Sequence, residues 1–152
     1  MKKIITVSIL AAIGLSLAGI AQAQVKPETL VKQRQAVMTL QSKYFYGELR
    51  RMAQGRIPYD ANAAARAAGF LDALSRMPWD GFAPSTKNVK SETLPAAFTD
   101  TAKFKEAQDR LQNETAKLVS LTKSGDEAAV KAQIGAVNKA CDSCHDDFRE
   151  KR

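Results

Sequence analysis

The residues of this chain best suited to chemistry lie near its C-terminal end, in Cys141-Asp142-Ser143-Cys144-His145. Cys-x-x-Cys-His is the attachment signature of c-type haem: two thiols add to the haem vinyl groups as thioethers, and the adjacent histidine gives an imidazole nitrogen to the iron. On a helix, Cys141 lies three residues before Cys144 and four before His145, so the three side chains project from one face. The motif therefore predicts one covalently attached haem c, with His145 as an axial ligand of the iron.

Other sites could use the same residues. A structural zinc site would need a fourth ligand, and the chain has only two Cys and one His. That ligand would have to be a carboxylate or water, which is unusual for a closed zinc site. A thioredoxin-type redox pair is expected near a βαβ pattern, not at the end of a helical chain. The simplest structural role for His145 is that of a solvated residue at a helix end. Haem attachment is the favoured interpretation.

The N-terminus has the three-part layout of a secretory signal peptide. Lys2 and Lys3 precede an apolar run over residues 4–20, and the small-x-small pattern of residues 21–23 follows. The run of about 17 residues is at the lower limit for a membrane span, and no basic cluster follows it directly. We expect cleavage after Ala23, a mature domain over residues 24–152 in the periplasm, and no membrane attachment after cleavage. Free thiols are unusual in such an oxidising compartment, and haem attachment would use both.

The mature chain divides into four predicted helices at its Pro and Gly residues. They cover residues 27–52, 61–77, 99–123 and 127 almost to the end of the chain. Asp60 is placed to cap the second helix, and Ser124-Gly125-Asp126 joins the third to the fourth. The long irregular stretch over residues 78–97 contains three of the five prolines, and a connection of that length in a compact domain is usually functional.

Apolar residues recur along these helices at the spacing of buried faces. In the first helix they are Val31, Met38, Phe45 and Met52, and in the third Phe104, Leu111 and Leu118. In the fourth they are Val130, Ile134, Val137, Cys141, Cys144 and Phe148, at spacings of 4, 3, 4, 3 and 4. No segment alternates over strand length. The pattern predicts an all-α fold, an antiparallel up-down-up-down four-helix bundle with haem c in its core, because the motif lies in the apolar seam.

The chain resembles cytochrome c′, the class II c-type cytochromes of bacterial periplasms. The resemblance rests on the C-terminal position of Cys-x-x-Cys-His, on Arg34-Gln35 followed by Met38, on the 74–82 stretch with Met77-Pro78-Trp79, and on the region around Pro95 and Phe98. In class I cytochromes the motif lies near the N-terminus and a downstream Met binds the iron. Here only seven residues follow His145 and none is Met, which excludes that class.

The resemblance also assigns roles to particular residues. It implies that Arg34 and Gln35 lie near the haem edge and its propionates, and that Met38 covers the distal face of the iron without binding it. Arg149, four residues after His145 and expected on the same helix face, matches a basic position beside the proximal pocket. Its structural alternative is a solvated or C-capping Arg at the helix end. Cytochromes c′ are commonly dimers, and an exposed apolar residue such as Leu40 would suit a homodimer contact.

The sixth coordination position of the iron decides the function. Without a second His, the strong protein ligands left are Met38, Met52 and Met77, of which Met38 on the buried stripe is the distal candidate. If Met38 only packs, the haem is five-coordinate and high-spin and binds NO or CO; the family resemblance implies NO binding, with roles in NO buffering or electron transfer. If Met38 binds, the protein is a low-spin electron carrier. A third hypothesis is a haem-free exported helical bundle that acts as an interaction module.

Other function classes receive less support from the sequence. No Ser, Asp or Glu constellation resembles a nucleophile with its base, so we expect that the protein is not an enzyme. The net charge of +7 is not accompanied by a basic stripe interleaved with aromatic residues, so nucleic-acid binding is not indicated. A redox partner protein could dock on the lysines of the third and fourth helices, although such residues usually form a solvated face. Trp79 and Phe82 are expected to pack in the core or at the haem edge.

Overall fold

The computed structural model describes residues 25–151, so the expected signal peptide lies outside the described residues. The helical elements are α1 (Pro27–Tyr44), η1 (Phe45–Leu49), α2 (Arg50–Ala53), α3 (Ala61–Ser75), η2 (Trp79–Phe82), η3 (Pro84–Thr86), α4 (Ala96–Thr99), α5 (Thr101–Thr122) and α6 (Glu127–Phe148). No strand forms between residues 25 and 151, where an isolated antiparallel bridge joins Thr93 to Arg149.

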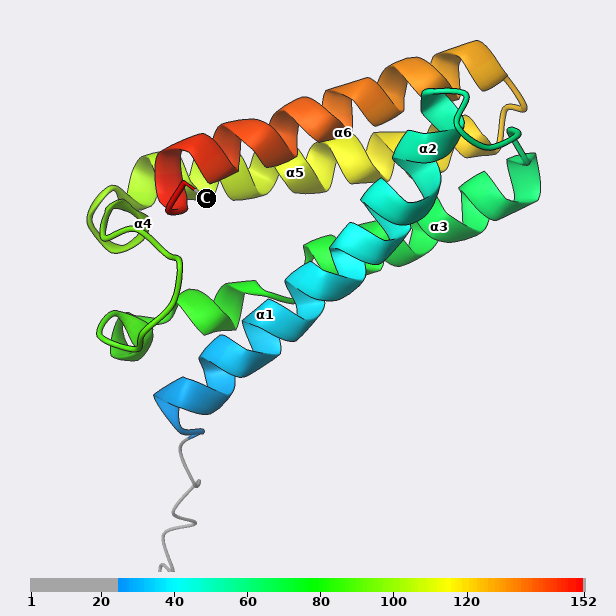
Figure 1. The fold of residues 1–152 in the computed structure, drawn as a ribbon. Coiled ribbons are helices and arrows are strands. Elements are labelled where there is room, and N and C mark those ends of the chain that lie inside the picture. The colour runs from blue at the N-terminus through cyan, green and yellow to red at the C-terminus, as the bar shows by residue number, and fades with distance from the viewer. Residues whose placement is uncertain (1–24, 152) are drawn as a thin grey trace, which may run out of the picture.

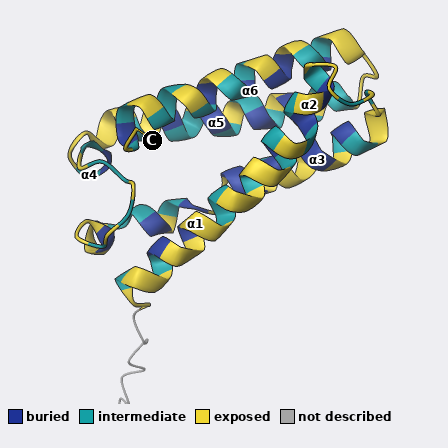
Figure 2. Cartoon of the chain, viewed as in Figure 1, coloured by how far each residue is buried: buried dark blue, intermediate teal, exposed yellow. Residues whose placement is uncertain are grey.

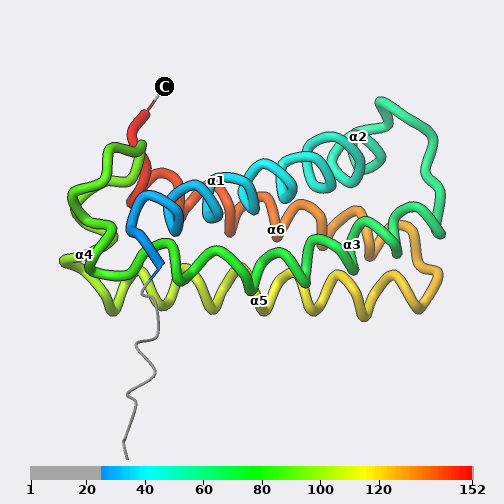
Figure 3. Tube along the Cα trace, turned by 90° about the horizontal axis from the view of Figure 1, so that it is seen from below, coloured from blue at the N-terminus to red at the C-terminus, as the bar shows by residue number. Residues whose placement is uncertain are grey.

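The four long helices form the predicted antiparallel bundle (Figure 1). α5 packs along α6, α3 packs along both α5 and α1, and α2 closes the ring against α6. The same neighbours appear in the view turned by 90° (Figure 3). α1 approaches α6 at the α2 end and diverges from it toward its own N-terminus (Figure 1). There α1 packs instead against η2 and η3.

Side-chain caps start three of the four long helices. Asp60 accepts a hydrogen bond from the Ala63 N–H at 2.7 Å, and Asp126 accepts one from Ala129 at 3.0 Å, which confirms both predicted starts. The cap of α5 is Asp100, which accepts from the Lys103 N–H at 3.2 Å, so this helix begins two residues later than expected. Gly125 has a φ of +75° in the α5–α6 turn, a conformation that glycine adopts without a steric penalty.

The sequence predicts one helix over residues 27–52, but this segment is not α-helical throughout. A π-helical segment, η1, interrupts the α-helix before α2. Its wider turn shifts the register of the side chains. As a result Phe45, Leu49 and Met52 are all buried, with 2%, 0% and 4% of their surface exposed.

Buried residues occur along all the long helices (Figure 2). Most of the apolar ones form two clusters. The main cluster runs through the bundle and includes Leu71, Leu118, Ile134 and Val137. A smaller cluster of Ala97, Ala107 and Phe148 lies where α4, α5 and α6 meet. Every apolar seam residue of α6 is buried except the two cysteines, which are half-buried. The seam predicted for the fourth helix is therefore confirmed.

The stretch predicted as irregular, residues 78–97, contains the short helices η2, η3 and α4. Gly81 in η2 is pressed directly against α1. A Cβ at this position would lie 2.5 Å from Arg34 Cβ and 2.9 Å from the Leu30 carbonyl oxygen. The absence of a side chain at Gly81 therefore allows the segment to dock on α1. Among the described helices, none is both long and apolar enough to cross a membrane.

Candidate haem site

The residues of the Cys-x-x-Cys-His motif occupy the last two turns of α6. Cys141, Cys144 and His145 are all half-buried, and neither cysteine is in a disulfide. As i, i+3 and i+4 neighbours on a regular helix, they share one side of α6. The structure thus brings the three motif residues together as the sequence predicts.

The two thiols lie in apolar surroundings at the junction of the two clusters. Cys141 packs against the main cluster, which Trp79 also contacts, and Cys144 packs against the smaller one. The pKa of Cys141 is raised to about 12 and that of Cys144 to about 11, mainly because both thiols are buried. The negative charges of Asp142 and Asp147, respectively, add to the two shifts. Because a porphyrin also needs an apolar environment, these surroundings fit a haem attached at both thiols.

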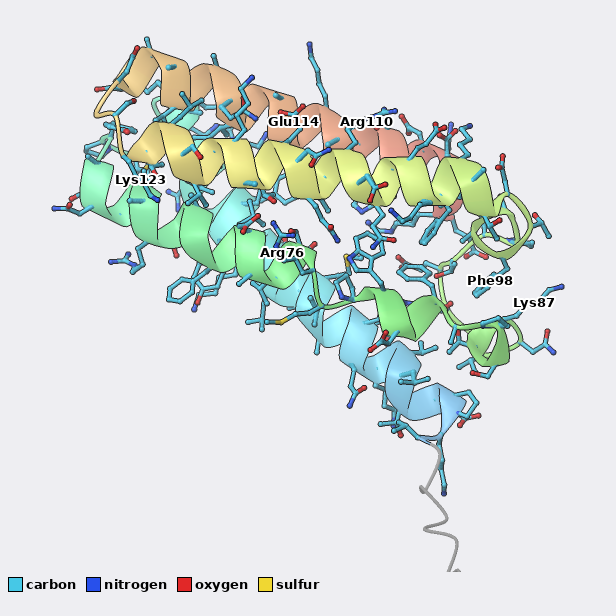
Figure 4. The ribbon with its side chains drawn as sticks, turned by 180° about the vertical axis from the view of Figure 1, so that it is seen from behind. Arg76, Lys87, Phe98, Arg110, Glu114 and Lys123 are labelled. Carbon is cyan, nitrogen blue, oxygen red and sulfur yellow. The ribbon has the colours of Figure 1, made fainter. Side chains whose placement is uncertain are left out.

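A row of aromatic rings connects η2 to the end of α6. Trp79 stacks on Phe82 at 6.0 Å between ring centroids, Phe82 lies 4.8 Å from Phe104, and Phe104 meets Phe148 edge-to-face at 5.1 Å. Phe98 lies at this same end of the bundle, whereas Lys123 lies at the opposite end (Figure 4). Phe82, Phe98 and Phe104 all pack against the smaller cluster that Cys144 contacts. These rings place apolar aromatic surface next to Cys144, which suits the packing of a haem macrocycle.

His145 lines an open hollow of about 450 Å³. The other lining residues are Asp146, Arg149, Glu150 and Lys151. Burial, and then the positive charge of Arg149, hold the pKa of His145 below its ordinary value. Both effects favour the neutral imidazole, which is the form that binds a metal.

Arg149 does not lie on the helix face where the sequence predicted it. It is the first residue beyond α6, with extended backbone angles of φ −128° and ψ 141°, and its N–H donates to the His145 carbonyl at 3.1 Å. α6 ends there because the backbone of residues 148–150 pairs with that of residues 92–94. Arg149 still lies beside His145 in the hollow, and its guanidinium forms an ion pair with Glu92 at 2.8 Å. No pattern in the sequence pointed to Glu92, because the contact depends on how the 83–95 segment folds back.

The residues that the resemblance singled out on α1 have different environments. Arg34 is buried, its Nη1 donates to the Gly81 carbonyl at 2.5 Å, and burial lowers its pKa. Gln35 is exposed and Met38 is half-buried. Arg34 therefore faces the interior of the molecule and Gln35 faces solvent.

The three methionines named as possible iron ligands are also separated. Met52 is buried in the main cluster on α2, and Met77, after the end of α3, has 58% of its surface exposed. α2 lies at the opposite end of the bundle from the end of α6 (Figure 1). Met38 lies on α1, four residues after Arg34, and is half-buried. It is therefore the one of the three that is neither buried in the main cluster nor largely exposed.

The chain is similar over most of its length to known proteins. The family model of cytochrome c′ matches residues 29–149. The cytochrome c′ of Rubrivivax gelatinosus is 39% identical over 127 residues, which cover 83% of this chain and 98% of the relative. Among solved structures, the nitric oxide complex of a mutant cytochrome c prime from Alcaligenes xylosoxidans superposes with a TM-score of 0.78 at 34% identity, over 85% of this chain and 99% of that one. A carbon monoxide-bound variant from the same organism gives a TM-score of 0.77 at 35% identity, over 84% and 98%.

The match covers nearly the whole described domain, including the Cys-x-x-Cys-His motif in α6 and the Arg34 region of α1. The chain belongs to the cytochrome c′ family, which binds haem c covalently.

Proposed function

We propose that Cys141 and Cys144 attach one haem c through thioether bonds and that His145 is its only protein axial ligand. When bound, haem c supplies an iron that takes small diatomic ligands and exchanges electrons. The observation that carries the assignment is the position of these three residues on one side of α6, with Cys141 packed against the main cluster and Cys144 against the smaller one. Each residue then has one task, and the chain has no further Cys or His.

In this proposal Met38 shields the distal side of the haem and does not bind the iron. Its backbone position is fixed by the docking of α1 on η2, through the Arg34–Gly81 hydrogen bond and the close packing at Gly81. The Arg34 guanidinium is engaged with Gly81 and Phe82, and both cysteines of the motif pack against apolar clusters. Such a pocket stabilises O₂ poorly, whereas NO and CO need no hydrogen-bond donor. The nitric oxide and carbon monoxide complexes of relatives support gas binding by this chain.

We infer a periplasmic protein that buffers NO or transfers electrons to a redox partner, without enzymatic activity of its own. Export would depend on residues 1–23, which have the layout of a signal peptide. A homodimer is supported by apolar residues on the outer side of α1 and α3: Leu40 and Phe70 are 43% and 46% exposed, and the Phe70 ring lies 4.9 Å from Tyr44. Sedimentation of the wild type and of Leu40→Asp tests this contact, and a monomeric wild type would contradict it.

The attachment is tested by expression with a cytochrome c maturation system. The wild type is expected to keep its colour after extraction with acidified solvent, because the haem is covalently bound, and its reduced form is expected to bind CO. Cys141→Ala with Cys144→Ala should lose the colour on extraction. Ser143→Ala, in the same motif, is the matched control and should keep it. A colourless wild type would instead support a haem-free helical bundle.

A further inference from the structure

Residues 92–94 form a short strap across the end of α6. The Leu94 N–H donates to the Phe148 carbonyl at 2.9 Å, and the Glu150 N–H donates to the Glu92 carbonyl at 2.8 Å. These two bonds flank the bridge between Thr93 and Arg149. The strap ties the long connection between α3 and α5 to residues 148–150, which follow the haem motif.

The side chain of Glu92 adds a contact that the strap's backbone does not make. Its Oε2 accepts from Arg149 Nε at 2.9 Å and lies 2.8 Å from Arg149 Nη2. An extended residue beyond a helix end can point its side chain in several directions, and a long arginine has many rotamers. The ion pair selects one of them, in which Arg149 lines the same hollow as His145.

The ion pair can be removed without dismantling the strap. The side chain of Arg149 is 34% exposed and that of Glu92 is 45% exposed. Ion pairs with this much exposure contribute little to overall stability. The backbone bonds of Glu92 and Leu94 do not need the carboxylate. Replacement of Glu92 should therefore alter the position of Arg149 while the fold is kept.

We propose that Glu92 is a positioning residue: it holds the Arg149 guanidinium beside His145 and so sets the electrostatic environment of the axial imidazole. This inference rests on the proposed function, in which His145 binds the iron. In this proposal Glu92 influences the imidazole through its ion pair with Arg149.

The test is a double-mutant cycle on the haem-loaded protein, read by the iron–histidine stretching band in the resonance Raman spectrum of the ferrous form. Glu92→Ala and Arg149→Ala should shift the band in the same direction, and the double variant should shift it no further than Arg149→Ala alone. Glu92→Gln, which keeps an acceptor oxygen, should give a smaller shift. Glu106→Ala removes an exposed acidic side chain from α5 and is the control; its band should stay at the wild-type position.

A second readout separates positioning from a merely structural role. In Glu92→Ala, hydrogen exchange at the Leu94 and Glu150 amides should accelerate by no more than about fivefold, because the lost pair is half-exposed. A band that stays in place in Glu92→Ala while it moves in Arg149→Ala would overturn the inference and leave the proposed function intact. Additive shifts in the double variant would also overturn it. A preparation without covalently bound haem would overturn both.

Discussion

The guanidinium of Arg34 lies over the ring of Phe82, with 4.3 Å between its Cζ and the ring centroid. One end of this contact belongs to α1 and the other to η2, 48 residues later in the chain. The same guanidinium donates to the Gly81 carbonyl, which also accepts from Thr86 Oγ1 at 3.1 Å. Arg34 therefore links the helix that carries Met38 to the aromatic row that borders the motif.

Replacement of Arg34 should loosen this link. Arg34→Met keeps much of the apolar stem but removes the charged hydrogen bond and the cation–π contact, so we expect a loss of about 1.5–3 kcal/mol of unfolding free energy. Chemical denaturation of the haem-loaded protein measures it. Lys32→Met, at an exposed position of the same helix, is the control and should change stability by less than about 0.5 kcal/mol. Equal stability of the two variants would show that the Arg34 contacts contribute nothing.

Gly81 should tolerate no side chain. In Gly81→Ala the new Cβ meets Arg34 Cβ and the Leu30 carbonyl at less than 3 Å, and the resulting displacement of α1 should cost about 1–3 kcal/mol. Gly135→Ala is the matched control, because Gly135 is exposed inside α6 and a Cβ there meets nothing within 4 Å. That variant should be more stable than the wild type by about 0.5–1 kcal/mol. Thermal unfolding should therefore move in opposite directions in the two variants.

A buried polar contact joins α3 to α5. The Thr115 hydroxyl donates to Asp72 Oδ1 at 2.8 Å and lies 3.2 Å from Ser75 Oγ, and Thr115 is fully buried. Thr115→Val has nearly the same shape but leaves these partners without the hydroxyl, so we expect a loss of about 1–3 kcal/mol in denaturant unfolding. Ser120→Ala removes an exposed hydroxyl that bonds only within α5, and its stability should match the wild type. A Thr115→Val variant as stable as Ser120→Ala would refute the prediction.

The stability of the domain should fall in alkaline solution partly through Tyr46. Burial, and then the negative charges of Cys141 and Asp142, raise the pKa of Tyr46 above its ordinary value of 10.0. Thioether formation removes the Cys141 charge, but burial still acts in the same direction. The folded state therefore disfavours the phenolate, and this stabilisation is present below pH 10 and is lost as the pH rises through the folded-state pKa.

The measurement compares the unfolding free energy of the wild type and Tyr46→Phe at about pH 8 and about pH 11, on either side of the ordinary tyrosine pKa. The wild type should lose more stability between the two conditions, because the phenylalanine ring of the variant has no hydroxyl to ionise. An identical loss in both proteins would contradict the role assigned to Tyr46.

The sequence was sufficient for the elements with strong local signals. The caps at Asp60 and Asp126, the glycine at position 125 and the α6 seam follow from the preferences of individual residues and from helical periodicity. The Cys-x-x-Cys-His spacing likewise predicted that the two cysteines and the histidine lie on one face of a helix. These features depend on neighbours within a few residues along the chain.

What could not be predicted depends on contacts between distant segments. The π-helical turn at Phe45–Leu49 has no local signature and arises because Phe45 and Leu49 both pack into the core. The end of α6 at Phe148 is imposed by the strap around Thr93. The docking of Gly81 on Arg34 joins residues that are 47 positions apart. Arg149 does not share the helix face of His145, because it lies just beyond the end of α6, where helical spacing no longer holds.

In the proposed function, His145 is the only protein ligand of the haem iron, and Met38 shields the opposite side of the haem without binding the iron. The most direct measurement is the spin state of the oxidised, haem-loaded protein, by electron paramagnetic resonance and absorption, in the wild type, Met38→Ala and the control Val37→Ala. We predict high-spin iron in all three, with faster CO binding after reduction only in Met38→Ala. A purely low-spin wild type that becomes high-spin in Met38→Ala but not in Val37→Ala would contradict the account and identify the protein as a Met38-ligated electron carrier.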